Sequence, residues 1–348
     1  MMQALINKYK KIRKAGFINK AFTEKYAFVG IGNHSLNNLY PVLNYLNVDI
    51  KYIVSHSEDT AKLIQANFEH INGTTNYDAV LNDSEIKGIF ISASPSAHFE
   101  LISKALKKNK NVFVEKPPCF TSKELSQLIE LEKQSKGFVL TGLQKRYAPL
   151  YQILKTKTKK AESYSLRYET GYYPEGNALT DLFIHPIDIT SFLFGNSELI
   201  SVLHRNSGKG IESLFIQLKH SNGTIGNIEL STNTWWASAE DTLRVNCKNA
   251  HYHCTNTEKL VKISKAGKIA GIPSEKIKNS FPISKVLFEK NAFLPVMQHN
   301  DLYSAGYYNE IRQFLELCEG KKGENNSELS MLTNTFQHLD NIKKQMHV

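Results

Sequence analysis

The stretch YAFVGIGNHSLNNLYPVLNYL (26–46) decides the fold class of this 348-residue chain. Residues 26–32 predict a short buried strand that runs into a glycine turn, and residues 36–46 carry leucines at helical spacing. Pro41 interrupts that spacing, so we expect the helix to start near it, with the proline in its first turn. A strand, a glycine turn and a helix in this order are typical of a nucleotide-binding α/β sheet.

The same alternation continues along the chain as far as about residue 147. Short apolar segments predict strands, and the amphipathic segments between them predict helices. The expected strands are 48–55, 86–93, 111–117 and 137–142, and the expected helices are 57–68, 98–108 and 121–134. This pattern predicts a parallel sheet with helical crossovers. We therefore expect a Rossmann-type dinucleotide-binding domain at 26–147, preceded by a basic extension at 1–25.

The pattern changes after residue 147, where predicted strands follow one another directly. They lie at 162–170, 198–206, 211–219, 224–232, 242–247 and 250–255. The turn HSNG (220–223) predicts a hairpin, and a helix is expected at about 181–194. Residues 258–290 predict a loop, and helices are expected at 303–318 and 327–345. We expect 148–348 to form an α+β substrate and oligomerisation domain with a mainly antiparallel, open sheet.

Composition excludes several classes of protein. The formal net charge is +10, but residues 1–25 alone contribute +6, so the body is not a general nucleic-acid binder on charge grounds. No apolar stretch reaches the ~18 residues of a membrane span. Four cysteines are too few for a disulfide framework in a chain of this length. We expect a cytoplasmic protein.

The basic extension predicts a helix of its own. Leu5, Tyr9 and Ile12 fall at helical spacing with lysines between them. We favour a surface helix whose apolar side packs on the body. The alternative is contact with an anionic membrane surface through residues 1–25.

The glycine turn is the first candidate site. Between a strand and a helix, backbone N–H groups and a helix N-terminus favour the pyrophosphate of a dinucleotide. The expected cofactor-binding residues here are Gly30, Gly32, Asn33, His34 and Ser35. Ser35 stands where the usual GxGxxG pattern has its third glycine.

The end of the second strand bears on cofactor choice. An acid at that tip would bind the ribose 2′-OH of NAD. The tip here is Ser55-His56-Ser57, and Glu58 and Asp59 come only afterwards. The absence of a carboxylate at the tip favours NADP over NAD, with Ser55 and His56 as donors to a 2′-phosphate. We expect NADP or NAD, with a lean towards NADP.

Two further clusters follow the third and fourth predicted strands, at the edge where open α/β sheets bind ligands. The first holds Ser94, Pro95 and His98, and the second holds Glu115 and Lys116. A Glu-Lys pair that closes an apolar strand is either a salt bridge at the strand end or a lysine directed into the cleft.

These features together resemble the Gfo/Idh/MocA oxidoreductase family, named for glucose–fructose oxidoreductase and inositol dehydrogenase. The resemblance runs from about residue 26 to the C-terminus. It rests on the glycine turn, Pro-x-x-His at 95–98, Glu115-Lys116-Pro117, Gln144-Lys145-Arg146-Tyr147 and Asp181-Leu-Phe-Ile-His-Pro-Ile-Asp188. It implies an NAD(P)-dependent enzyme that acts on a secondary hydroxyl or keto group of a sugar, nucleotide sugar or polyol. It also implies a homodimer or homotetramer, cofactor contacts from Arg146, and catalytic roles for Lys116, Asp181 and His185.

The residue types suit this chemistry. Oxidation of a secondary alcohol needs a base for the hydroxyl proton, and histidine has a pKa near working pH. Asp181 precedes His185 by four residues, so on one helix the two would share a face, and the carboxylate would orient the imidazole. Lys116 would hydrogen-bond the reacting oxygen. Pro186 favours a later helix start, near Leu182 or Phe183, and then Asp181 would cap the helix instead.

Residues around this motif supply candidate substrate contacts. Tyr173, Glu175 and Trp235 are expected to meet a sugar beside Lys116, Asp181 and His185, and the alternative is loop packing or a subunit interface. We expect no metal site, because the spacing of Cys247, His251, His253 and Cys254 matches no common zinc pattern. Two other functions stay open: an NAD-dependent glycosidase that works by transient oxidation, and a non-catalytic dinucleotide-sensing regulator.

Overall fold

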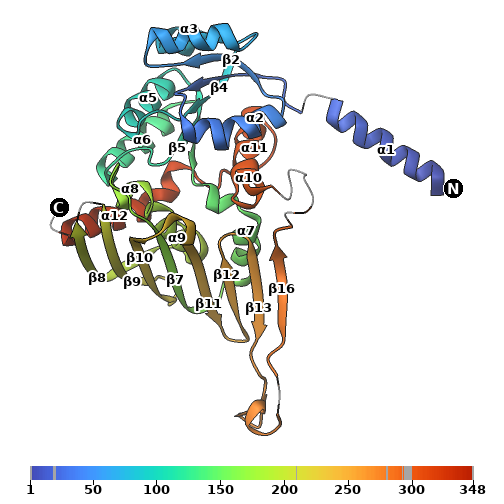
Figure 1. Cartoon of the computed structure of the whole chain (residues 1–348), viewed down its shortest axis with the longest axis vertical. Coiled ribbons are helices and arrows are strands. Elements are labelled where there is room, and N and C mark those ends of the chain that lie inside the picture. Colours follow the sequence, from blue (N-terminus) through green and yellow to red (C-terminus); the bar gives the residue numbers. More distant parts are fainter. Residues whose placement is uncertain are drawn as a thin grey trace. The chain divides into compact units, whose positions relative to one another are not determined.

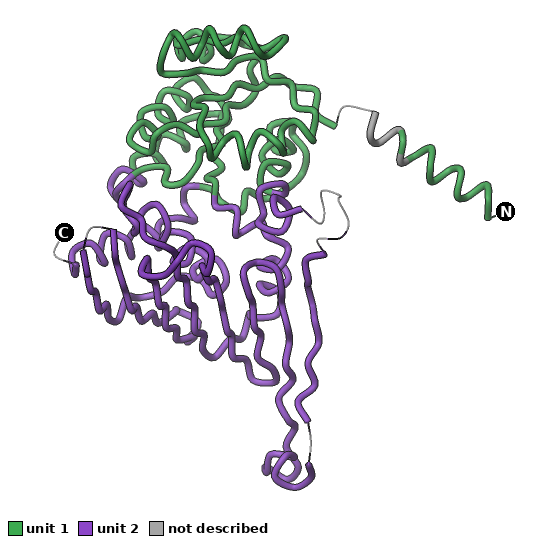
Figure 2. The backbone as a smooth tube through the Cα atoms, viewed as in Figure 1, with its two compact units in different colours: residues 1–119, 127–142, 310–328 green, residues 120–126, 143–309, 329–348 purple. Residues whose placement is uncertain are grey.

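The computed structural model describes residues 2–18, 21–208, 210–279, 281–291, 293 and 300–346. The chain divides into two units (Figure 2). Unit 1 contains residues 1–119, 127–142 and 310–328, and unit 2 contains residues 120–126, 143–309 and 329–348. Residues 310–328, which we assigned to the second domain, therefore pack with the first.

Unit 1 is built on a six-stranded parallel sheet, which confirms the predicted fold class (Figure 1). Its order is β3-β2-β1-β4-β5-β6, and the direction of strand addition reverses between β1 and β4. The strands are β1 Lys25–Val29, β2 Asp49–Val54, β3 Asn72–Thr74, β4 Ile86–Ile91, β5 Asn111–Glu115 and β6 Val139–Gly142. The connecting helices are α2 Tyr40–Tyr45, α3 Glu58–Asn67, α4 Tyr77–Asn82, α5 Pro95–Lys107 and α6 Ser122–Gln134.

An aromatic cluster explains why residues 310–328 join unit 1. Helix α11 (Tyr307–Cys318) places Phe314 against Phe90, with ring centroids 4.9 Å apart, and against Phe113 at 5.9 Å. Gly88 in β4 makes room for this helix, because a Cβ there would lie 3.0 Å from both Phe314 and the Cys318 Sγ. Burial of large aromatic side chains dominates core energetics, so this helix is part of the unit 1 core.

The first helical segment differs from our prediction. Residues Ser35–Leu39 form one π-helical turn, and α2 follows directly with Pro41 in its first turn. The helical run therefore begins before the proline, because a π turn can lead into a helix whose first residues need no internal N–H donor.

Unit 2 is built on an eight-stranded sheet that is mainly antiparallel, as we predicted, with the order β16-β13-β12-β11-β7-β10-β9-β8. Among the described strands of this sheet, β7 and β10 form the one parallel pair. Its strands are β7 Ala161–Gly171, β8 Ser197–Gly208, β9 Ile211–His220, β10 Ile225–Thr234, β11 Glu240–Cys247, β12 Ala250–Thr255, β13 Lys259–Ser264 and β16 Ser284–Glu289. The helices of this unit are α7 Pro149–Lys157, α8 Ala178–Asp181, α9 Ile184–Phe194, α10 Asp301–Ser304 and α12 Thr333–Gln345.

Residues 258–290 are not the loop that we predicted. They form β13 and β16, which pair and extend the sheet, and a small hairpin of β14 (Lys268–Ile269) and β15 (Ile272–Pro273) lies between them. Frequent lysines in this segment concealed the strand pattern, and β13 carries Lys259 and Lys262 although it pairs with both β12 and β16.

The N-terminal helix α1 spans Met2–Ile18, which confirms the predicted helix. Its apolar residues Leu5, Tyr9 and Ile12 are exposed, so in this structure they do not pack on the body as we favoured. In the described part of the chain, every helix is too short or too polar to cross a bilayer.

Candidate active site

The glycine turn of unit 1 lies at the point where the strand order reverses. Gly30 directly follows β1 and has φ +89°, a conformation that favours glycine. A Cβ at this residue would lie 2.5 Å from the carbonyl oxygen of Ser92, which follows β4. The Gly30 N–H donates to the Val54 carbonyl oxygen at 2.9 Å. The loops after β1, β2 and β4 therefore come together at this edge, and only glycine fits at the crossing.

Ser35 completes this turn instead of obstructing it. Its side chain is buried, and its Oγ accepts a hydrogen bond from the Gly32 N–H at 2.9 Å. The side chain therefore faces inward, away from the outer side of the loop. Gly32 is exposed, and a Cβ there would have no neighbour within 4 Å. An open glycine before a helical segment fits a dinucleotide pyrophosphate.

His34 links this turn to the end of β5. Its Nε2 lies 3.1 Å from Glu115 Oε1, and its Nδ1 lies 3.1 Å from the Asn38 side-chain nitrogen. Glu115 is buried, whereas His34 and Asn33 are exposed. The structure thus brings together His34 and Glu115, two predicted cofactor residues that are far apart in the sequence.

His98 holds the loop that carries Lys116. Its two ring nitrogens lie 2.8 Å from the Pro117 carbonyl oxygen and 3.0 Å from that of Ala93. Burial lowers the pKa of His98, against a weaker opposing effect of the two carbonyl oxygens. Lys116 itself is half-buried. Ser94 is the exposed N-cap residue of α5, and Pro95 is the first residue of that helix. His98 therefore fastens the loops after β4 and β5 to each other.

At the tip of β2 the side chains of Ser55 and Ser57 form hydrogen bonds within the loop, and the side chain of His56 is exposed. Ser55 is buried, and its hydroxyl donates to the Ser57 carbonyl oxygen at 2.9 Å. The Ser57 hydroxyl caps α3 by accepting from the Thr60 N–H at 3.2 Å. His56 is exposed between them. Of the two donors that we expected for a 2′-phosphate, His56 is the accessible one.

In unit 2 the predicted helix at 181–194 is two helices. Helix α8 ends at Asp181, and α9 begins at Ile184, so Asp181 and His185 do not share one helix face. The physical reason is Pro186, which lacks an N–H and is tolerated only in a first turn. His185 lies in the same turn of α9 and is 8% exposed.

Asp181 does not cap α9, which was our alternative, because Phe183 is the N-cap residue of that helix. It binds the start of α8 instead, and it has two partners. Its Oδ2 accepts from the Asn177 N–H at 2.9 Å and from the Tyr173 hydroxyl at 3.3 Å. Gly176 allows this approach, because a Cβ there would lie 2.3 Å from Oδ2. Burial and the Asp181 carboxylate raise the pKa of Tyr173 to about 12, so the phenol stays protonated and donates.

The other candidate substrate residues differ in their surroundings. Trp235 and Glu175 are exposed. Trp236 instead packs on Gly171, and its indole N–H donates to the Tyr172 carbonyl oxygen at 3.1 Å. Trp236 therefore supports the loop that carries Tyr173, whereas Trp235 is available for contacts.

Arg146, which we expected at the cofactor, forms a buried ion pair inside unit 2. Its Nε lies 2.7 Å and its Nη2 2.6 Å from the two carboxylate oxygens of Asp188. Thr335 donates a further hydrogen bond to Asp188 at 3.0 Å. This bidentate geometry ties the segment after β6 to α9, so Arg146 has a structural partner there.

Sequence reasoning assigned no role to Asp188 or to the pair Lys145–Asp241, whose Nζ and Oδ2 lie 2.6 Å apart. Asp188 carried a usable signal, since a lone acid in the apolar segment Ile184–Phe194 needs a buried cation. Lys145 carried no such signal, because its partner lies on a distant strand.

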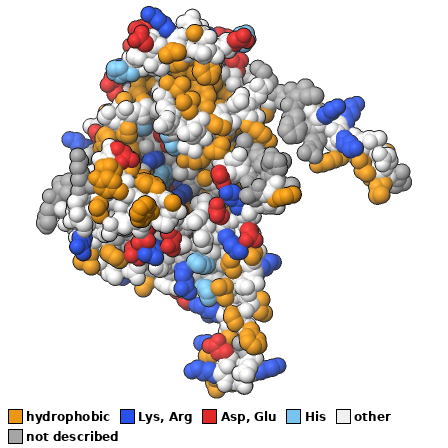
Figure 3. Space-filling view, in the orientation of Figure 1, with side chains coloured by type: hydrophobic (Ala, Val, Ile, Leu, Met, Phe, Trp, Pro, Cys, Tyr) orange, Lys and Arg blue, Asp and Glu red, His pale blue; other side chains and the backbone are white. Residues whose placement is uncertain are grey.

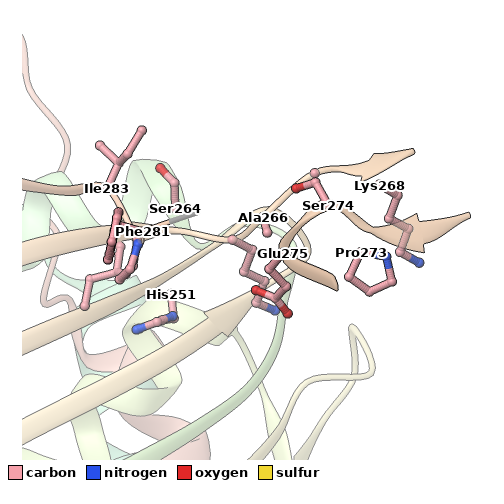
Figure 4. Close-up of a pocket in the computed structure, with 13 residues that line it drawn as sticks. His251, Ser264, Ala266, Lys268, Pro273, Ser274, Glu275, Phe281 and Ile283 are labelled. Carbon is pink, nitrogen blue, oxygen red and sulfur yellow. The ribbon is translucent and has the colours of Figure 1, made fainter. Parts of the chain in front are cut away.

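A separate hollow of about 630 Å³ lies at the end of the β13–β16 hairpin (Figure 4). His251, Phe281 and Ile283 lie towards one end of it, and Lys268 and Pro273 lie towards the other. None of its lining residues belongs to the predicted active site.

Comparison with known proteins agrees with this arrangement. The chain is 28% identical over 196 residues to the uncharacterised oxidoreductase YhhX of Escherichia coli, covering 50% of this chain and 55% of YhhX. It is 32% identical over 127 residues to inositol 2-dehydrogenase of Salmonella typhimurium, covering 34% of this chain and 38% of that enzyme. In these two matches the chain thus spans about half, or less, of each relative.

A crystal structure of a dehydrogenase from Chromobacterium violaceum has the same fold, with a TM-score of 0.77 and 20% identity over 93% of this chain and 95% of that one. Residues 24–143 match the oxidoreductase family with an NAD-binding Rossmann fold, and residues 156–253 match the Gfo/Idh/MocA C-terminal domain. The chain therefore belongs to the Gfo/Idh/MocA oxidoreductase family.

Proposed function

We propose that this protein is an NAD(P)-dependent oxidoreductase that acts on a secondary hydroxyl or keto group of a sugar, nucleotide sugar or polyol. The observation that carries the proposal is the open turn Gly30–Ser35 at the switch point of the unit 1 sheet. The relatives include an inositol dehydrogenase, which supports a polyhydroxylated substrate. When bound, the nicotinamide ring would accept or deliver the hydride.

The chain's own residues supply the proton chemistry in this proposal. His185 takes the hydroxyl proton on its imidazole during oxidation and returns it during reduction. Lys116 donates a hydrogen bond to the reacting oxygen and stabilises the negative charge that develops on it. Asp181 orients the substrate side of unit 2 through its bonds to Tyr173 and the Asn177 N–H. Tyr173, Glu175 and Trp235 bind the remaining hydroxyls and C–H faces.

Other side chains of unit 1 hold the cofactor. Gly30, Gly32, Asn33 and His34 would face the pyrophosphate. Ser94 and Pro95, at the N-terminus of the 13-residue helix α5, would lie beside it. We propose that His98 and Ser55 act by holding segments of unit 1 in place, since each already has a protein partner there. Arg146 acts within unit 2, where it holds the segment after β6 on α9.

We also propose that NADP is preferred over NAD. The tip of β2 carries the exposed His56 and no carboxylate, so a 2′-phosphate would meet a donor there and not a charge of the same sign. The carboxylates of Glu58 and Asp59, in the first turn of α3, would repel a 2′-phosphate and so limit the preference for NADP.

The protein is further proposed to form a homodimer or homotetramer through the open face of the unit 2 sheet. Leu203 on β8 and Phe215 on β9 are a cross-strand pair, and both are exposed. Light scattering on the wild type and on Phe215→Asp tests this. Dissociation of the variant is expected, and a monomeric wild type would contradict it.

The test of the function is turnover of the purified protein with a panel of polyols and sugars, followed by nicotinamide absorbance. We expect His185→Ala to lower kcat by about 10² or more, with dinucleotide binding retained. His251→Ala, another histidine of unit 2, is the matched control and should leave kcat unchanged. An unchanged rate in His185→Ala would contradict the mechanism.

The same assay separates the two other functions. A glycosidase that works by transient oxidation would release sugar without net change in absorbance. A dinucleotide-sensing regulator would bind the cofactor and turn over no substrate of the panel.

A further inference from the structure

Two segments hold all of the net positive charge of this protein. Residues 1–25 contribute +6, and residues 258–290, with eight lysines and three glutamates, contribute +5. The other 290 residues therefore sum to −1. Both segments lie almost wholly outside the two matched family domains, 24–143 and 156–253. The net positive charge thus lies almost wholly outside the two matched family segments.

The first segment combines this charge with an exposed apolar face. Met2, Leu5, Tyr9 and Ile12 follow at spacings of three and four residues along α1 and are between 62% and 77% exposed. Five basic residues and no acidic one share the helix. Figure 3 shows hydrophobic atoms along one edge of α1 and basic atoms along the other. A helix of this kind is typical of the bilayer interface.

The tip of the β13–β16 hairpin repeats the combination in unit 2. The side chains of Ile269, Ile272, Phe281 and Ile283 are between 50% and 89% exposed there. Four exposed lysines lie in the same segment: Lys265, Lys268, Lys276 and Lys278. Figure 3 shows basic side chains around the tip of the hairpin. The 630 Å³ hollow of Figure 4 lies within this tip.

We propose that α1 and the hairpin tip, each on its own unit, bind the surface of a bilayer that contains anionic lipids. The apolar side chains would enter the boundary between headgroups and acyl chains, while the lysines would pair with lipid phosphates and carboxylates. The cytoplasmic leaflet is the anionic one, which fits the expected cytoplasmic location.

Two other binding partners, a nucleic acid and a second copy of α1, fit these surfaces less well than a bilayer. A nucleic acid would engage the lysines but would leave Leu5, Ile12 and Phe281 in water, since phosphate contacts need no aliphatic side chain. A second copy of α1 would bring two strongly basic helices together, and like charges repel.

The experiment is co-sedimentation of the full chain with vesicles of phosphatidylcholine alone or with 30% phosphatidylserine. At 0.15 M salt we expect binding to the phosphatidylserine vesicles, with at least tenfold weaker binding to phosphatidylcholine alone and at 0.5 M salt. Lack of binding to the phosphatidylserine vesicles would overturn the proposal.

Matched variants assign the binding to residues. Exchange of Lys8, Lys11 and Lys14 for glutamine is expected to weaken binding about tenfold or more. The same exchange at exposed Lys107, Lys108 and Lys136 removes equal charge elsewhere and should change it less than twofold. Equal effects of the two triple variants would overturn the helix contact.

Variants of single apolar residues test the proposed contacts with the acyl chains. Leu5→Gln should weaken binding severalfold, whereas Leu63→Gln, at a leucine of the same 63% exposure on α3, should not. Phe281→Gln should weaken binding severalfold as well, and an unchanged affinity would overturn the contact at the tip. If Leu5→Gln lowers the oligomeric mass and leaves vesicle binding intact, α1 binds a second copy, and the membrane proposal is wrong. Dinucleotide binding checks that each variant is folded.

Discussion

The proposed cofactor residues of unit 1 and the proposed substrate residues of unit 2 are held in different ways. In unit 1 the proposed cofactor segment is loop backbone at strand ends, where Gly30 passes within van der Waals contact of the residue after β4. In unit 2 the proposed substrate residues include one short segment, where Tyr173 and the Asn177 N–H hold Asp181. The unit 1 segment is determined by main-chain geometry that few residues can adopt. The unit 2 segment is determined by side-chain contacts that can vary while the fold persists.

The largest expected effect tests whether Lys116 of unit 1 and His185 of unit 2 act in one reaction. Lys116→Met and His185→Ala should each lower kcat by about 10²–10⁴. If both groups act in the same step, the double variant should lose little more than the worse single variant. A loss equal to the product of the two single losses would mean that the two residues act independently. Steady-state turnover of the three variants measures this.

A pair of glycine variants sharpens the contrast between backbone and side chains. Gly30→Ala forces a Cβ against the Ser92 carbonyl oxygen at a positive φ, so we expect about a 10²-fold loss of NAD(P)H affinity. Gly176→Ala instead meets side-chain atoms, the Asp181 carboxylate at 2.3 Å and the Tyr173 ring and hydroxyl at 2.8 Å, and these can shift. It should keep cofactor affinity and lower kcat about tenfold. The reverse pattern, with cofactor binding lost only in Gly176→Ala, would contradict the division of labour.

A carboxyl group of unit 1 predicts how stability depends on pH. Burial raises the pKa of Glu132 to about 7, against a weaker opposing effect of the Val139 N–H. Between about pH 4.5 and pH 7 the unfolded chain loses this proton first, so stability falls as pH rises. Glu132→Gln should remove that fall and stabilise the protein at pH 8 by on the order of 2 kcal/mol. Thermal unfolding at pH 5 and pH 8 tests it, with Glu130→Gln as the exposed control; an unchanged slope in Glu132→Gln would contradict it.

The smallest expected effect concerns substrate contacts. Trp235→Ala should raise KM for the best substrate about fivefold and leave kcat unchanged, because an exposed aromatic ring contributes uniform binding. Trp236→Ala should instead lower kcat, because Trp236 supports the Tyr173 loop through Tyr172. If Trp235→Ala has no effect on KM, the ring faces another surface.

Much of unit 1 could be predicted from the sequence, because its determinants are local. A strand, a glycine turn and a helix occur together within residues 26–46, and the Glu115-Lys116-Pro117 motif directly follows a strand. Three features could not be predicted. Phe314 joins the unit 1 core from more than two hundred residues away, Arg146 pairs with the buried Asp188, and strand β13 pairs with β16. Each depends on pairing between distant segments, which periodicity cannot reveal.

The break between helices α8 and α9, at Leu182 and Phe183, could be predicted only in part. The sequence contained its cause, Pro186, and allowed both a shared helix face and a capping aspartate. The structure has neither arrangement, because α9 begins after Phe183. Asp181 accepts from the Asn177 N–H and from Tyr173, a partner that no spacing rule connects to it.

The most direct test of the central claim is a fluorescence titration of the cofactor-stripped protein with NADPH and with NADH. Saturable binding of both is predicted, with NADPH the tighter ligand, and His56→Asp should reverse the order because it restores a carboxylate at the tip of β2. No binding of either dinucleotide to a folded sample would contradict the account, since the turn closed by Ser35 would then not be a cofactor site.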